Sequence, residues 1–284
     1  MLFWQEAASG WIIAAAALFG LVVGSFLNVV IYRLPIMMQR EWEQEARAVL
    51  DLPSPSPQPD RYNLWWPRSR CPVCERPIKA HENIPILSFL FLRGRCPGCA
   101  THISWQYPVV ESVTALLFVV TAWHFGPTPT GLTALLFTGI LIAAAGIDAR
   151  TTLLPDQITL PLLWFGLACN YFGLFTDLES AVIGAIAGYL SLWTIYHGYR
   201  LLTGKEGMGF GDFKLLAALG AWLGWQALPA ILLLASMVGA IVGIGLILLR
   251  GRDRNIPIPF GPFLAAAGWL ALIWGDVLQT FYLV

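Results

Sequence analysis

The chain has 284 residues, of which 57% are hydrophobic and only 12% are charged. A soluble domain carries about 25% charged residues, so this composition excludes an ordinary soluble enzyme and a disordered chain. The net charge at pH 7 is zero, which excludes a nucleic-acid-binding protein that relies on a basic surface. The composition predicts a polytopic membrane protein.

Eight apolar runs are long enough, or nearly long enough, to cross about 30 Å of hydrocarbon as helices. The spans are expected at residues 11–32, 108–125, 131–147, 158–175, 181–202, 213–225, 228–249 and 260–281. The run at 213–225 is short, so it is either tilted or packed against protein instead of lipid. No Lys or Arg precedes the first run, which is also too long for a signal peptide, and we interpret it as a retained helix. We therefore predict an all-α membrane protein of about eight transmembrane helices.

The basic residues are distributed unevenly between the connections. If the eight spans alternate in direction, all 17 Lys and Arg residues fall on one side of the membrane. The positive-inside rule assigns that side to the cytoplasm, so both termini are expected outside. The expected organisation is a first transmembrane helix (1–32), a cytoplasmic insertion (33–107) and a seven-helix membrane core (108–284).

Two CxxC pairs lie in the insertion, at Cys71-Pro-Val-Cys74 and Cys96-Pro-Gly-Cys99. A CxxC turn can direct two thiolates at one ion, and two such turns complete a tetrahedral set of four ligands. Structural disulfides are rare in the cytoplasm, so the pattern predicts a zinc site that stabilises a small loop-rich domain.

Alternatives to this zinc site concern the same segment and the remaining cysteine. The four thiols could instead form redox-active dithiols or carry no metal. His81 and His102 are possible ligands, but four cysteines already suffice, and surface positions suit both histidines better. Cys169 lies within a predicted span and is expected to be a packing residue. The stretch from Glu41 to Asp60, rich in Glu and Pro, has no assigned role, and its alternating prolines predict a stiff linker.

Two aspartates stand at the cytoplasmic ends of apolar spans, where ionisable residues usually mark function. Asp148 ends the third span, and Asp212 follows Gly207-Met-Gly-Phe-Gly at the start of the sixth. They can meet if the third and sixth helices pack together. Two facing carboxyls can share a proton, so that one activates water and the other donates to a carbonyl oxygen. That pair can hydrolyse a peptide, and the glycines leave backbone open for an extended substrate.

Structural interpretations compete with this one. Asp212 could be only an N-cap, and Asp156, after Pro155, is a better N-cap candidate for the fourth span. Asp148 could pair with Arg150. Glu111 is also expected at the cytoplasmic face and could serve a site, whereas Asp276 is expected near the outer face.

The motifs together resemble those of type IV prepilin peptidases. The resemblance rests on Gly24-Ser-Phe-Leu-Asn-Val-Val-Ile-Tyr-Arg-Leu-Pro35, the paired CxxC turns, Asp148 with Leu154-Pro155-Asp156, and Gly209-Phe-Gly-Asp212. The last is the GxGD motif shared with intramembrane aspartyl proteases such as the presenilins.

The resemblance implies a bifunctional enzyme of the bacterial inner membrane. Its substrates would be prepilins or pseudopilins of type IV pili or type II secretion. The enzyme would remove a short basic leader at the cytoplasmic face and N-methylate the new N-terminus from S-adenosylmethionine. Asp148 and Asp212 would be the catalytic pair, and Cys71, Cys74, Cys96 and Cys99 would bind zinc. No segment is identified for the methyl donor.

Two further hypotheses remain open at this point. The chain could be a peptidase only, with the zinc domain as a substrate-docking platform. It could also be a transporter or an assembly scaffold, although its acids lie at one membrane face instead of the midplane.

Asp148 and Asp212, which we call the dyad, would share one proton. The dipole at the C-terminal end of the third helix disfavours a charge on Asp148. The N-terminal dipole of the sixth favours one on Asp212, so the shared proton is expected on Asp148.

Overall fold

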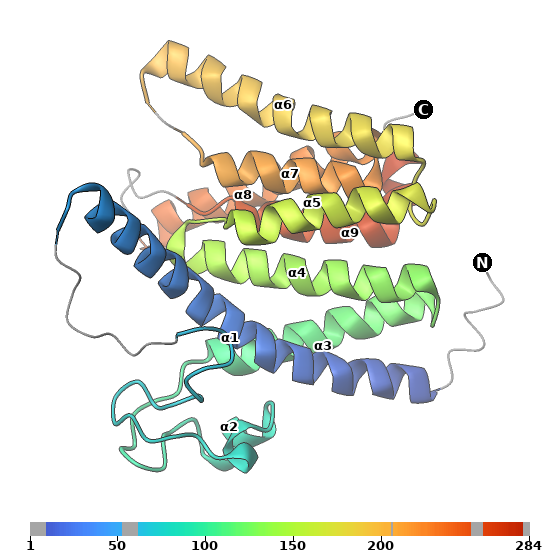
Figure 1. The fold of residues 1–284 in the computed structure, drawn as a ribbon. Coiled ribbons are helices and arrows are strands. Elements are labelled where there is room, and N and C mark those ends of the chain that lie inside the picture. Colours follow the sequence, from blue (N-terminus) through green and yellow to red (C-terminus); the bar gives the residue numbers. More distant parts are fainter. Residues whose placement is uncertain (1–9, 53–61, 206, 251–257, 281–284) are drawn as a thin grey trace. The chain divides into compact units, whose positions relative to one another are not determined.

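The computed structural model describes residues 10–52, 62–205, 207–250 and 258–280. These residues are mostly helical, and the only β-type pairing among them consists of two isolated bridges, Arg70 with Pro77 and Arg95 with His102. The predicted all-α architecture is therefore confirmed (Figure 1). The linker predicted from the alternating prolines lies outside the described residues. The chain divides into two compact units, Met1–Trp123 and His124–Val284, which we describe in turn.

The first unit begins with α1 (Gly10–Val49), a single helix of 40 residues that contains Pro35. We expected the membrane helix to end at residue 32, where the insertion was expected to begin. The helix instead continues, since the residues after Pro35 are mostly strong helix formers. Arg33 is buried here and fastens the insertion to the helix, because its guanidinium donates to the backbone oxygens of Asn63 (2.9 Å) and Pro67 (2.6 Å).

The helix α3 (Gln106–Phe125) packs tightly against α1. A Cβ atom on Gly20 would lie 2.7 Å from the Cα of Ala115, and one on Gly24 would lie 2.8 Å from the Cα of Glu111. Small residues four apart allow two membrane helices to approach backbone to backbone. This spacing fixes which residues of α3 face α1.

The insertion between these helices contains two short elements, a 3₁₀ turn at Ala80–Asn83 and the helix α2 (Leu87–Phe91). The ring of Phe89 lies 4.9 Å from that of Trp105, between centroids. The apolar side chains on the other side of α2 stay exposed, namely those of Leu87, Leu90 and Phe91.

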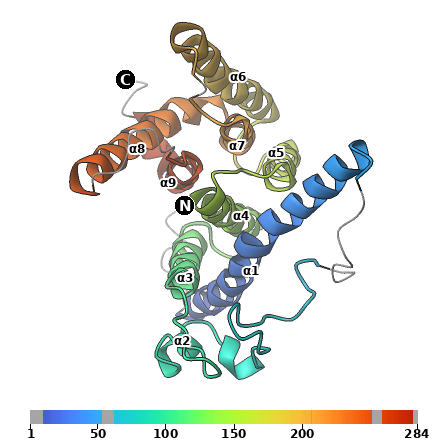
Figure 2. The same ribbon diagram turned by 90° about the vertical axis from the view of Figure 1, so that its left-hand side faces the viewer.

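The second unit is a bundle of six longer helices (Figures 1 and 2). They are α4 (Pro129–Thr151), α5 (Asp156–Tyr171), α6 (Leu178–Thr203), α7 (Phe210–Leu223), α8 (Leu228–Arg250) and α9 (Gly261–Thr280). With α1 and α3, each of the eight apolar runs corresponds to a described helix. Five helices are long and apolar enough to cross a membrane, whereas α5, α7 and the apolar part of α9 are shorter. The number of crossings therefore stays a prediction.

The short helix α7 lies inside this bundle, in contact with α5, α6 and α9 (Figure 2). All its side chains between Phe213 and Trp222 are buried except that of Lys214, which is partly exposed. Of the two explanations for the short sixth run, packing against protein is therefore the correct one. A helix surrounded by protein on every side does not need the length of a lipid-facing span.

Polar contacts fix the C-terminal end of α7, opposite the end that bears Asp212. The side chain of Asn170, at the end of α5, donates to the backbone oxygens of Ala221 (2.8 Å) and Trp222 (2.9 Å). Its Oδ1 atom accepts from the N–H groups of Phe175 and Thr176, both at 3.1 Å. One buried amide thus satisfies four backbone groups and joins α7 to the connection between α5 and α6.

Candidate active site and metal centre

Both predicted aspartates are buried in the second unit. Asp148, in the last turn of α4, is 4% exposed, and Asp212, in the first turn of α7, is 7% exposed. Their carboxyls are close enough to interact electrostatically. From the sequence, the two aspartates could meet if α4 and α7 packed together. In the structure α5 and α9 each contact both helices, and they hold the two aspartate-bearing ends towards each other (Figure 2).

Asp148 is held by the start of α9. Its Oδ2 atom accepts a hydrogen bond of 2.8 Å from the backbone N–H of Gly261, the first residue of that helix. A Cβ atom at this glycine would lie 2.7 Å from the same oxygen, so only glycine leaves room for the carboxyl. Our sequence analysis missed Gly261. The Gly-Pro pair at the start of an apolar run was the available signal.

Asp212 is the third residue of α7, and Gly209 is the N-cap. The hypothesis that Asp212 is the N-cap is therefore wrong in position. Its backbone N–H donates to the carbonyl oxygen of Gly209 at 3.2 Å. The Oδ1 atom is buried and has no hydrogen-bond partner among the described residues. One carboxylate oxygen of the pair therefore remains available to a ligand or to the other carboxyl.

The Leu-Pro-Asp motif closes the site from the connection between α4 and α5. Leu154 contacts the backbone positions of both Gly211 and Gly261, where Cβ atoms would lie 2.6 and 3.0 Å from its side chain. Asp156 accepts two hydrogen bonds from the Lys214 ammonium, at 2.6 and 2.7 Å. The prediction that Asp156 caps the fourth span is wrong, because the residue is the first of α5 and its carboxylate binds Lys214 instead. The motif thus contacts α7, which bears Asp212, and the start of α9, which binds Asp148.

The four predicted zinc ligands converge in the first unit. The sulfur atoms of Cys71, Cys74, Cys96 and Cys99 all lie within 4.8 Å of one another. Two of these separations are 3.8 Å (Cys71 to Cys99) and 3.9 Å (Cys74 to Cys96). Four thiolates about 2.3 Å from a tetrahedral zinc ion would be about 3.8 Å apart, so the cluster fits the ion.

The two CxxC turns have the same backbone form. The residue after each second cysteine, Glu75 or Ala100, has a positive φ, and its N–H donates to the carbonyl of the first cysteine in its pair. Hydrogen bonds favour the thiolate at Cys71 and at Cys99, whereas at Cys74, despite a hydrogen bond from the Arg76 N–H, burial and the neighbouring thiols raise the pKa to about 11. The N–H groups of Cys74 and Val73 lower the pKa of Cys71. The hydroxyl and N–H of Thr101 lower the pKa of Cys99 to about 6. The thiolate is the form that binds a metal ion.

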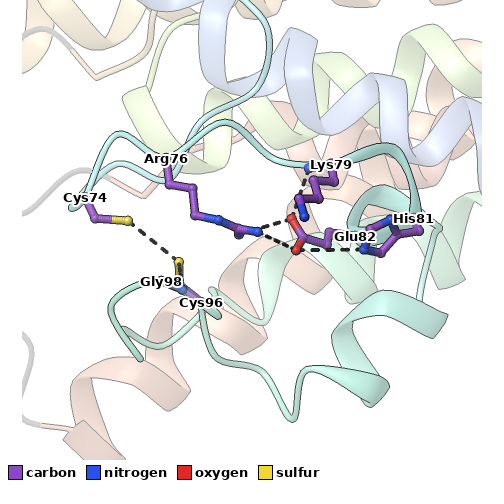
Figure 3. Close-up of polar contacts among 7 residues, drawn as sticks. All are labelled: Cys74, Arg76, Lys79, His81, Glu82, Cys96 and Gly98. Atoms are coloured by element: carbon purple, nitrogen blue, oxygen red, sulfur yellow. Dashed lines mark hydrogen bonds and ion pairs between the residues drawn. The ribbon is translucent and has the colours of Figure 1, made fainter.

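An ion pair beside the cluster braces the loop between the two turns (Figure 3). The Arg76 guanidinium donates to both carboxylate oxygens of Glu82, at 2.7 and 3.1 Å, and lowers the pKa of Glu82 to about 2. The Nε2 atom of His81 lies 4.0 Å from a carboxylate oxygen of Glu82. The backbone of His102 forms an isolated β-bridge with that of Arg95. Neither histidine belongs to the thiol cluster, as predicted.

Three further residues singled out in the sequence have different positions. Glu111 is buried in α3, where its Oε2 atom accepts a 2.7 Å hydrogen bond from the Ile86 N–H. Cys169 is buried within α5, in agreement with a packing role. The side chain of Asp276 lies outside the described part of the structure.

Comparison with known proteins assigns the family. Residues 18–125 match the Bacterial Peptidase A24 N-terminal domain, and residues 135–244 match the Type IV leader peptidase family. Prepilin leader peptidase/N-methyltransferases are similar over 94% of this chain. That of Aeromonas salmonicida (strain A449) is 61% identical over 92% of its own length, and that of Pseudomonas aeruginosa is 54% identical over 91%. The chain belongs to the prepilin leader peptidase/N-methyltransferase family.

The two family matches correspond closely to the two compact units of the chain. The N-terminal match ends at residue 125, two residues after the first unit ends at Trp123, and the peptidase match begins at 135, within the second unit. The thiol cluster and Glu111 therefore belong to the N-terminal family domain, and both aspartates belong to the peptidase domain. None of the solved structures matches the chain.

Proposed function

We propose that this chain removes the leader peptide from prepilins or pseudopilins and then N-methylates the new N-terminal residue. The observation that carries the proposal is the pair of buried, interacting carboxyls within the matched peptidase domain. The names of the relatives, which include both activities, support the same two steps.

The peptidase step needs one carboxylate to take a proton from water and one carboxylic acid to protonate the substrate carbonyl oxygen. Asp148 and Asp212 fill these roles. The Gly261 N–H fixes the orientation of Asp148, and the Oδ1 atom of Asp212 has no competing partner among the described residues. A Cβ atom at Gly209 would meet nothing within 4 Å, so backbone beside Asp212 is open to an extended peptide.

The thiol cluster would hold one zinc ion through Cys71, Cys74, Cys96 and Cys99. Four sulfur ligands close the coordination sphere, so the ion would be structural and would fix the fold of the insertion. The methyl group would come from S-adenosylmethionine, which supplies an electrophilic methyl carbon when bound.

The proposed location is the bacterial inner membrane, with both termini outside and the dyad at the cytoplasmic face. The distribution of Lys and Arg supports this orientation. The proposed organisation keeps a first transmembrane helix, a cytoplasmic insertion and a membrane core. Lipid and the prepilin are the proposed partners.

The decisive experiment is co-expression with a prepilin, followed by mass spectrometry of the pilin. Asp148→Asn and Asp212→Asn should each abolish leader removal while the protein still accumulates in the membrane. Normal processing by either variant would refute the dyad. Processing by the wild type without the added methyl would favour the alternative, a peptidase whose zinc domain only docks the substrate.

A further inference from the structure

Glu111 is the one acidic side chain in the described part of the first unit that is buried, at 7% exposure. It lies five residues into α3, which places it about 7.5 Å from the start of that helix, near the expected cytoplasmic face. Its Oε2 atom accepts a hydrogen bond of 2.7 Å from the Ile86 N–H. No cationic side chain among the described residues forms an ion pair with it, so its charge is not compensated within that part of the chain. A buried carboxylate in this state is costly and is usually functional.

A buried acceptor without a partner among the described residues lies one helical turn from Glu111. Asn28 is 2% exposed and donates through Nδ2 to the backbone oxygen of Tyr107 at 3.1 Å. Tyr107 lies one turn before Glu111 in α3. Gly24, which packs on Glu111, likewise lies one turn before Asn28 in α1. The Oδ1 atom of Asn28 is buried and has no hydrogen-bond partner among the described residues. An uncompensated carboxyl and an unpartnered amide oxygen therefore lie one turn apart in the same helix pair.

The backbone that covers Glu111 is strained. Ile86 has a φ of 60°, a left-handed value that β-branched residues rarely adopt. Its N–H is the group that binds Glu111, so the strained turn and the buried carboxylate are held together by one hydrogen bond. Strain of this kind is typical of functional sites, where a segment must change position.

We propose that Glu111, with Asn28 beside it, binds the ammonium group of the processed pilin N-terminus and accepts its proton during N-methylation. This inference rests on the proposed function. An α-amino group has a pKa of about 8 and is mostly protonated near neutral pH, so it must lose a proton before it can be methylated. An ammonium group supplies both the positive charge and the hydrogen-bond donors that the site lacks.

The reaction balances in charge and atoms. The Glu111 carboxylate takes one proton from the ammonium and becomes a carboxylic acid. The nitrogen lone pair of the free amine then forms a bond to the methyl carbon of a sulfonium donor, while the carbon–sulfur bond breaks and its electron pair stays on sulfur. The products are a secondary ammonium and a neutral thioether, and Glu111 later returns its proton to water.

The test compares Glu111→Gln with Glu111→Ala in the full-length protein, with Thr114→Val as a control in the same α1–α3 interface. Gln keeps an acceptor for the Ile86 N–H but removes the charge, whereas Ala removes both. We expect Glu111→Gln to cleave prepilin normally and to methylate it at least about 100-fold more slowly, as when a general base is lost. A purely structural Glu111 predicts near-normal methylation by the Gln variant, and that result would overturn the proposal. Loss of cleavage together with methylation in the Gln variant would overturn it too, whereas failure of the proposed function would appear in the wild type.

A binding measurement gives a readout that does not depend on turnover. The probes are a peptide with the mature pilin N-terminus, with a free or an acetylated amino group, and S-adenosylmethionine alone. The wild type should bind the free amine at least tenfold more tightly than the acetylated peptide, and Glu111→Gln should lose this preference. Unchanged discrimination would refute the assignment. Weakened binding of S-adenosylmethionine with unchanged discrimination would show that the site takes the amino group of the donor instead.

Discussion

Gly261 offers the sharpest test of how the dyad is built. Its N–H binds the Oδ2 atom of Asp148, and a Cβ atom there would lie 2.7 Å from that oxygen and 3.0 Å from Leu154. Its φ lies outside the left-handed region, so alanine introduces no backbone strain at this position. The substitution Gly261→Ala therefore acts on the carboxyl and not on the fold of α9.

The magnitude follows from the geometry. Ordinary contacts between a carbon and an oxygen begin near 3.2 Å, so the methyl group would displace the carboxyl by roughly 0.5 Å. A misplacement of 1 Å can reduce a rate about 100-fold, so half that distance corresponds to about tenfold. Loss of a hydrogen bond to a charged group, about 1.5–3 kcal/mol, corresponds to about 10–100-fold if it is fully expressed in the rate. We expect leader removal to slow by about 10–100-fold.

The assay is the initial rate of leader removal from purified prepilin in mixed micelles. Gly245→Ala, in α8, is the control, because a Cβ atom there would meet nothing within 4 Å. A Gly261→Ala enzyme that cleaves at the wild-type rate would show that the position of Asp148 does not depend on α9. Equal slowing by the control would show that the effect is not local.

Three further predictions concern stability, metal and protonation. Asn170→Ala leaves four backbone groups without their partner and should lower the free energy of unfolding by about 3 kcal/mol, measured by denaturation in detergent. Metal analysis should find one zinc per chain with four sulfur ligands at about 2.3 Å by X-ray absorption, and a chelator or Cys71→Ser should make the insertion sensitive to protease. Isotope-edited infrared spectra should find the shared proton on Asp212, because Asp148 receives the Gly261 N–H whereas one oxygen of Asp212 has no partner in the described residues; a protonated Asp148 would contradict this.

Local patterns were sufficient to predict the helices and the thiol cluster. The apolar runs locate all eight long helices because helix formation in lipid depends on continuous hydrophobicity, and a CxxC turn brings its own two thiols together. The end of α1 was not predictable in this way, since the apolar run stops near Tyr32 while the helix continues to Val49. Helix propensity and the contacts of Arg33, which come from a loop thirty residues later, decide that boundary.

The dyad was predictable in its members but not in its surroundings. Asp148 and Asp212 stand out because acids at the ends of apolar runs are rare, whereas Gly261 is more than a hundred residues from Asp148 and carries no side chain to signal a role. The expectation for the shared proton considered only the ends of α4 and α7. The start of α9 adds a third helix end beside Asp148, and its N–H favours the opposite assignment.

The glycines of α6 and α7 have a consequence for how the bundle can move. At Gly184 and Gly220 the two backbones touch, and at Gly188 a Cβ atom would lie 2.6 Å from the carbonyl oxygen of Leu216. No side chain stands between the helices here, so neither can roll or slide without losing contact along its length. α6 and the C-terminal half of α7 must therefore move together, whereas beside Asp212 the rings of Tyr189 and Tyr196 lie between α6 and Phe213, and only side chains need to shift there.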